Sequence, residues 1–167
     1  MKHASVRRLM VLLLGGAAAA AIAADSKIDV SLIIDKAAAE AILEQPVKAP
    51  TPRNVEGSDG YYSKCNYYST DAKRRLILRI YQASTGFDPQ KELEAVAENT
   101  GAMRVVSGLG DKARISSGVQ GGLPSQVVMV YVVKGNSLVT VGISGIADEN
   151  AAAAKVKDAA QKIVAKL

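Results

Sequence analysis

Apolar residues at helical spacing follow a capping residue in the first part of the chain. A helix is expected over residues 32–43, with Ser31 as its N-cap and Pro46 just beyond its end. One side of this helix should be buried, because its apolar residues recur three and four positions apart. The residues predicted to face inward are Leu32, Ile33, Ala37, Ala41 and Ile42.

Two further helices are predicted from the same kinds of signal. Asp88-Pro89 supplies a cap and a first-turn proline for a helix that should close at Gly101. The last helix is expected over residues 148–166, with acids at its start and lysines towards its end, as the helix dipole favours. The apolar stripes are Leu93, Val96 and Ala97 in the middle helix and Val156, Ala160, Ile163, Val164 and Leu167 in the last.

Runs rich in β-branched and aromatic residues predict strands between these helices. The strongest signal is Gly135-Asn136, a two-residue loop with the residue types that primed hairpin turns require. It predicts the cross-strand pairs Val132 with Val139, Val130 with Val141 and Val128 with Ile143. The other side of the hairpin is also largely apolar, so both sides should be covered. The strands are expected at residues 61–70, 75–82, 103–106, 113–116, 126–134 and 137–144.

The order of these elements is neither a strict alternation of strand and helix nor all-β. It predicts an α+β fold, in which a twisted antiparallel sheet of about five to six strands carries N-terminal, middle and C-terminal helices.

The first 24 residues have the pattern of a signal peptide. A basic start precedes an apolar run that is short and rich in alanine and glycine. Small residues place the expected cleavage after Ala23 or Ala24. Residues 25–167 would then form a single exported domain, periplasmic or secreted, with no membrane span, because no later run reaches the roughly 18 apolar residues of a membrane helix.

Removal of this leader changes both the charge balance and the available chemistry. It takes three of the 21 lysines and arginines, which leaves 18 against 16 acids, a net charge of +2. Nucleic acid is therefore not expected as a partner, because the field is weak for a phosphate backbone. Loss of the single histidine, His3, excludes histidine-based nucleophilic catalysis and zinc sites of the Cys/His type. We predict no catalytic residue, no metal and no cofactor.

Cys65 should lie opposite Leu78 on the apolar side of its predicted strand. We expect a buried core residue, since free cysteine packs as a small hydrophobe. The alternative is an intermolecular disulfide, because the compartment is oxidising. A catalytic role is not expected, since no histidine and no helix start stand beside the thiol.

Residues 105–113 (VVSGLGDKA) have the Gly-x-Gly-x-x-Ala spacing of a dinucleotide-binding turn. That motif needs a helix that begins at the glycines and directs its N–H groups at a pyrophosphate. The residues that follow, Arg114 to Gly118, have no helical stripe. A tight turn between two strands is predicted instead.

A group of cations and tyrosines is the candidate binding site. If residues 69–74 form a hairpin loop, the flanking strands bring eight residues to one sheet face, opposite the side of Cys65. Such a surface can hold an anion by charge, while the rings stack or make cation–π contacts. The alternative is the ordinary solvent side of a half-buried sheet. The predicted ligand-binding residues are Tyr62, Lys64, Tyr68, Arg75, Arg79 and Tyr81, with Asn66 and Ile77 on the same face.

Four segments in a fixed order carry a resemblance to a known family. They are residues 41–47 (AILEQPV), 64–67 (KCNY), 106–113 (VSGLGDKA) and 134–136 (KGN) before an alanine-rich last helix. The chain resembles a family of small exported proteins of unknown function, best known as actinobacterial lipoproteins. The resemblance implies a PsbP-like α/β sandwich and no known catalysis. The chain departs from the family in two ways: it has no second cysteine near the first helix and no lipid-attachment cysteine.

These observations favour an exported, non-enzymatic binding module of the cell envelope, whose partner is a small anionic ligand or an envelope protein. One alternative is an accessory of an envelope complex that works through an apolar surface, such as the outer side of the 127–143 hairpin. The other is a hydrolase that acts on wall glycans with carboxylates alone.

Overall fold

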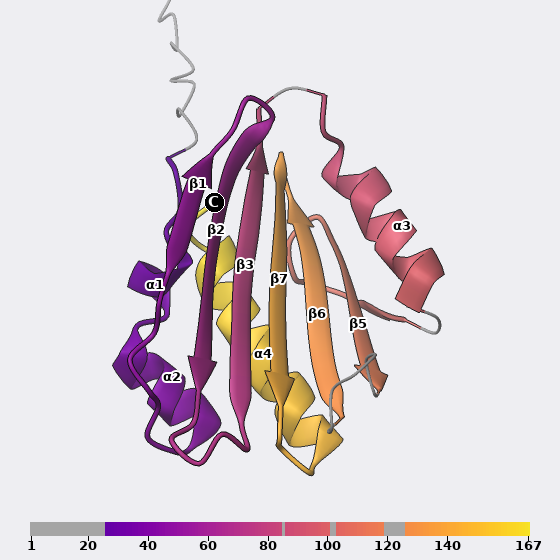
Figure 1. Ribbon diagram of the computed structural model, residues 1–167. Coiled ribbons are helices and arrows are strands. Elements are labelled where there is room, and N and C mark those ends of the chain that lie inside the picture. The colour runs from indigo at the N-terminus through magenta and orange to yellow at the C-terminus, as the bar shows by residue number, and fades with distance from the viewer. Residues whose placement is uncertain (1–25, 85, 101–102, 119–125) are drawn as a thin grey trace, which may run out of the picture.

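Seven antiparallel strands form one sheet in the order β1-β2-β3-β7-β6-β5-β4 in the computed structural model (Figure 1). The structure describes residues 26–84, 86–100, 103–118 and 126–167. The strands are β1 (Arg53–Glu56), β2 (Gly60–Tyr68), β3 (Arg75–Ala83), β4 (Arg104–Val106), β5 (Lys112–Gly118), β6 (Val127–Lys134) and β7 (Ser137–Ser144). The helices are α1 (Val30–Ile33), α2 (Lys36–Leu43), α3 (Pro89–Thr100) and α4 (Glu149–Val164).

The α+β class and the antiparallel sheet are confirmed, but the predicted number of five to six strands is too low. The strand that the sequence pattern missed is β1. All four of its residues are exposed, so it has none of the alternation between buried and exposed positions by which a strand is recognised.

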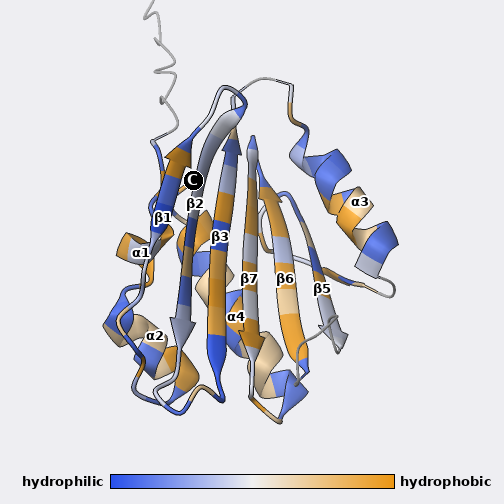
Figure 2. Ribbon diagram, viewed as in Figure 1, coloured by the Kyte–Doolittle hydropathy of each residue, from blue (hydrophilic) through white to orange (hydrophobic). Residues whose placement is uncertain are grey.

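The two faces of the sheet are covered unequally. Helices α1, α2 and α4 pack on one face and enclose the larger core, which includes Leu76, Leu78 and Ile80 of β3 (Figure 1). On the opposite face, α3 lies beside β5 and β6, and its buried Leu93 packs in a smaller cluster with residues of β6 and β7 (Figure 1). We call this second face the open face. Figure 2 shows hydrophobic bands along β6 and β7 and hydrophilic bands on β2 and β3.

The β6–β7 hairpin has the predicted register. Val132 pairs with Val139, Val130 with Val141 and Val128 with Ile143. Gly135 adopts a positive φ of 54°, as the predicted turn requires. The expectation that both sides of this hairpin are covered is also confirmed, because every residue from 127 to 133 and from 137 to 143 is buried. Its outer side is therefore not the exposed apolar surface that an accessory role would have used.

The first predicted helix is wrong in its start and in three of its five inward-facing residues, whereas Ile33 and Ile42 pack against the larger core as expected. The chain forms two helices because Asp35 accepts a hydrogen bond from the N–H of Ala38 and begins α2 anew. Asp29, and not Ser31, caps α1. The break changes the helical phase, so Leu32 is 82% exposed and Ala37 and Ala41 are exposed as well. The residues that these two helices and their junction bury are Val30, Ile34, Ala39 and Leu43.

The other two helices begin where they were predicted. The Asp88 carboxylate accepts from the N–H groups of Gln90 and Lys91 at the start of α3, and Asp148 caps α4. The inward-facing residues of α4 are buried as expected, except Leu167, which lies beyond the helix and is exposed. Gly101 and the predicted leader with its cleavage site at Ala23 or Ala24 lie outside the described residues. Among the described residues, no helix is both long enough and apolar enough to cross a membrane.

The glycine-rich segment joins two strands, as predicted. It connects β4 to β5, and no helix follows its glycines. Gly108 and Gly110 both have positive φ. A β-carbon at Gly110 would lie 2.5 Å from the carbonyl oxygen of Val133, so the turn also depends on a close approach to β6.

Candidate functional site

The β2–β3 pairing brings the predicted binding residues to one face. Tyr62 pairs with Tyr81, Lys64 with Arg79, and Tyr68 with Arg75, and the predicted pair of Asn66 with Ile77 lies between the last two. Cys65 and Leu78 pair on the opposite face. The predicted register is therefore confirmed, and it places the cations and tyrosines on the open face. Their role in binding a ligand stays a prediction.

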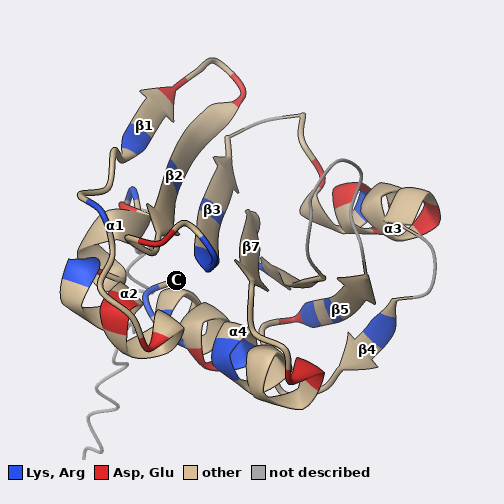
Figure 3. Cartoon of the chain, turned by 60° about the horizontal axis from the view of Figure 1, so that its bottom comes forward, with Lys and Arg blue, Asp and Glu red and all other residues tan. Residues whose placement is uncertain are grey.

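Strand β1 adds a cation that the sequence pattern did not reveal. Arg53 pairs with Lys64, which in turn pairs with Arg79. Side chains at paired positions point to the same side of a sheet, so three neighbouring strands each contribute one cation at the same level. Figure 3 shows these basic positions as blue bands on β1, β2 and β3. We call Arg53, Lys64 and Arg79 the cationic row.

No member of the cationic row takes part in an ion pair among the described residues. The described residues form seven ion pairs, and none of these includes Arg53, Lys64, Arg79 or Arg75. By contrast, Lys112 on the same face lies 2.7 Å from Glu94 of α3. Arg75 instead lies over the ring of Tyr68, with 4.9 Å between its guanidinium carbon and the ring centroid. This is a cation–π geometry, which leaves the charge of Arg75 without an anion.

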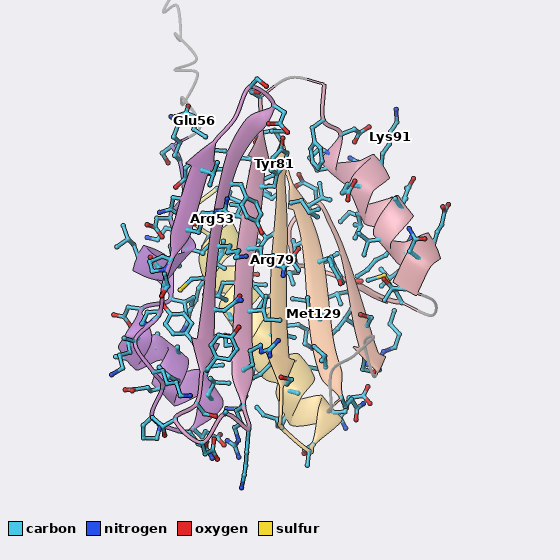
Figure 4. All side chains as sticks on the ribbon, in the orientation of Figure 1. Arg53, Glu56, Arg79, Tyr81, Lys91 and Met129 are labelled. Atoms are coloured by element: carbon cyan, nitrogen blue, oxygen red, sulfur yellow. The ribbon has the colours of Figure 1, made fainter. Side chains whose placement is uncertain are left out.

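A groove of about 540 Å³ lies on the open face between β3 and α3. Four of the six predicted residues line it, whereas Lys64 and Tyr68 lie on the same face outside its lining. Figure 4 looks onto this face and shows Arg79 and Tyr81 on β3 and Met129 on β6. The lining residues are Tyr62, Arg75, Ile77, Arg79, Tyr81, Phe87, Glu92, Val96, Met129, Tyr131, Leu138 and Thr140.

The floor of the groove is apolar where β3, β7 and β6 meet. Ile77, Gly142 and Met129 lie side by side on these three strands. A β-carbon at Gly142 would lie only 2.1 Å from the sulfur of Met129. The missing side chain at position 142 therefore gives the Met129 thioether room to lie flat on the sheet.

Some buried polar atoms on the open face have no partner. Within the described residues, the buried side-chain atoms without a hydrogen bond are Asn66 Oδ1, the Tyr81 hydroxyl and Arg114 Nε. All three residues belong to the same face, because Asn66 pairs with Ile77 and Arg114 with Tyr131. Burial, together with the nearby Asp59 carboxylate, raises the pKa of Tyr81. Tyr81 thus keeps its proton as a donor, while its ring packs edge-on against Phe87 at 4.3 Å between centroids.

Residues from outside the β2–β3 hairpin complete the groove, and the prediction from sequence did not include them. The alternation along the β6–β7 hairpin could have indicated Met129, Tyr131 and Leu138, which occupy its outer side. Phe87, Glu92 and Val96 reach the groove only because α3 packs on this face. No local signal in the sequence determines on which face of a sheet a helix will lie.

Two other chemical candidates are the Cys65 thiol and a pair of carboxylates. Cys65 is fully buried in the larger core, as predicted, and burial raises the pKa of its thiol. Glu92 is the one carboxylate among the described lining residues, so they do not include the two carboxylates that a glycosidase uses. The described residues also contain no group of three or more His, Cys, Asp or Glu side chains that could hold a metal ion.

Comparison with models of known protein families gives no match to this chain. A comparison with curated proteins likewise gives no match.

Proposed function

We propose that this protein is an exported, non-enzymatic binding module of the cell envelope, and that its open face holds a small anionic ligand. The observation that carries the proposal is the cationic row beside the groove. Like charges directly opposite one another on paired strands destabilise a sheet. An anion that binds between these cations relieves their repulsion, so the cationic row is suited to hold an anion.

The position of Arg75 and Arg79 supports the same proposal. Both line the groove from β3, four residues apart on the same side of the strand, and neither is neutralised by a described carboxylate. Guanidinium groups are suited to carboxylates and phosphates because their donors form a planar fork. The tyrosines of the lining offer rings and hydroxyl donors beside these charges.

Three sequence features support the parts of the proposal that concern location and chemistry. The leader pattern of residues 1–24 supports export. The absence of histidine after the leader supports binding over catalysis. The resemblance to small exported proteins, with the PsbP-like fold that it implies, supports both export and a non-enzymatic role.

A thermal-shift experiment on the purified protein tests the proposal. Inorganic phosphate, carboxylates and anionic glycan fragments should raise the melting temperature, because a ligand that binds the folded state stabilises it. The double variant Arg75→Gln/Arg79→Gln should lose this shift. A matched control, Lys157→Gln/Lys162→Gln, removes two exposed cations from α4 on the far side of the sheet and should keep it. Equal shifts in both double variants would contradict the proposed site.

A further inference from the structure

We infer that the groove takes a single-chain amphipathic anion, whose charged group lies beside Arg75 and Arg79 and whose apolar chain lies over Ile77, Met129 and Leu138. This inference rests on the proposed function and adds the chemical class of the ligand. It follows from the composition of the groove, in which a charged side and an apolar floor are continuous.

The apolar floor argues against a purely ionic ligand. Ile77 and Leu138 both line the groove, and each is less than a tenth exposed. Val96 of α3 continues this lining on the other side. Ligand sites are typically apolar surfaces with a few placed polar groups, and burial of an alkyl chain on such a floor is favourable.

The charges around the groove give the ligand a direction. Arg75 begins β3, and Arg79 follows on the same side of the strand. The acids lie away from these two arginines. Asp59 lies near Tyr81, towards the other end of β3, where burial and this carboxylate raise the pKa of the tyrosine. Glu92 lines the groove from α3. An anion is attracted by the arginines and repelled by these carboxylates. The charged group therefore belongs at the Arg75–Arg79 side, and the chain extends towards Leu138.

The size of the groove fits one chain. Its volume of about 540 Å³ lies within the range of roughly 300–1,000 Å³ that is usual for small-molecule sites. Gly142 preserves depth at the floor, because a side chain there would collide with the end of Met129. An alanine at position 142 would displace the Met129 side chain, which lines the groove, so position 142 is a steric test of the apolar part alone.

Isothermal titration calorimetry with three probes tests the inference. Octyl phosphate carries both parts of the proposed ligand, inorganic phosphate carries the charge alone, and octan-1-ol carries the chain alone. Octyl phosphate, below its micelle concentration, should bind at least about tenfold more tightly than either. Burial of a few methylene groups suffices for that gain over inorganic phosphate, and the charge-assisted bonds to arginine provide the gain over octan-1-ol. Octanoate should bind as well, because a carboxylate offers the same bidentate oxygens to arginine.

Two variants separate the charged part from the apolar part. Arg75→Gln/Arg79→Gln should weaken octyl phosphate about tenfold or more and abolish the binding of inorganic phosphate. Gly142→Ala should weaken octyl phosphate and leave inorganic phosphate unchanged. Lys157→Gln/Lys162→Gln serves as the control and should bind both like the wild type. Circular dichroism spectra and melting curves establish that each variant is folded.

The outcomes distinguish this inference from the proposed function. If inorganic phosphate binds through Arg75 and Arg79 and the octyl chain adds no affinity, the amphipathic ligand is wrong and the anion site stands. If no probe binds, or if octan-1-ol binds as tightly as octyl phosphate and the arginine variant changes nothing, both are wrong. Binding to vesicles of phosphatidylglycerol without binding of monomeric octyl phosphate would also overturn the inference, because it would indicate a membrane surface as the partner.

Discussion

Lys64 and Arg79 stand directly opposite each other on β2 and β3, and Arg53 flanks Lys64 on the other side. Like charges at paired positions are unfavourable, whereas opposite charges contribute about 0.2–1 kcal/mol relative to an alanine pair. The sheet therefore carries an electrostatic cost at this position. A cost of this kind is typical of positions that are kept for function and not for stability.

We predict that Lys64→Glu stabilises the fold while it weakens anion binding. The new carboxylate would face both Arg53 and Arg79, and the free energy of unfolding should rise by up to about 1 kcal/mol at low salt. The gain should shrink as salt is added, because exposed charges are screened. Urea unfolding measures the effect. The free energy of unfolding of Lys64→Gln should lie between those of the wild type and Lys64→Glu. A lower free energy of unfolding for Lys64→Glu would show that the row carries no strain from repulsion.

Tyr67→Phe should destabilise the fold by about 1–3 kcal/mol, the usual cost of losing a buried hydrogen-bond partner. Tyr67 is 1% exposed, and its hydroxyl donates to the carbonyl oxygen of Ile34, which joins α1 to α2. Burial also raises the pKa of Tyr67, so the hydroxyl remains a donor. Urea unfolding is the measurement.

The neighbouring Tyr68→Phe is the matched control for that variant. Tyr68 is 37% exposed and points to the opposite face, where its ring contacts Arg75. Phenylalanine keeps this ring, so the change should stay within about 0.5 kcal/mol of the wild type. Equal losses in the two variants would mean that the bond to Ile34 contributes nothing specific.

The thiol of Cys65 should be unreactive in the folded protein. It is fully buried, and burial raises its pKa, so both access and thiolate population are low. Labelling with a chromogenic disulfide reagent at pH 8 should follow the rate of unfolding. Thr70→Cys, placed in a Cys65→Ala background, should react at once, because residue 70 is exposed. Native labelling of Cys65 as fast as this control would instead favour a thiol available for an intermolecular disulfide.

Asp111 should make the stability of the fold depend on acid pH. Its carboxylate accepts from the N–H of Gly135 at 2.7 Å and from Lys134 Nζ at 3.0 Å. The Gly135 bond, followed by the contact with Lys134, lowers the pKa of Asp111 below its ordinary value of 3.8. The folded state is therefore stabilised fully above that ordinary pKa, and the contribution is lost as the pH falls through the lowered pKa.

The comparison of Asp111→Asn with the wild type measures this contribution. The difference in free energy of unfolding should be constant between about pH 6 and 7 and should shrink below about pH 4. Lys134→Met should keep most of the pH dependence, because the Gly135 bond remains. An equal difference at pH 3 and pH 7 would contradict the role of the carboxylate.

The register of β2 and β3 could be predicted because the sequence itself records it. Leu76, Leu78 and Ile80 recur at every second position and define the apolar side of the strand. A loop over residues 69–74 then fixes every pair. The β6–β7 register was predictable for a similar reason, since Gly135-Asn136 determines the turn.

What could not be predicted depends on tertiary packing. Strand β1 has no buried residue, so its pairing with β2 left no apolar pattern. The break between α1 and α2 depends on Asp35, which competes as a cap with an otherwise plausible longer helix. The groove exists because α3 packs over β6, and the stripe around Leu93 would have suited either face of the sheet.

The two faces of the sheet contribute unequally to the stability of the fold. Most of the fully buried side chains belong to the core beneath α1, α2 and α4, while the cations of β1, β2 and β3 contribute little to that core. Exchange of those outward residues would leave the scaffold intact, because none of them belongs to that core. Under the proposed function, a few substitutions on these three strands would change which ligand is bound without altering the core that determines the fold.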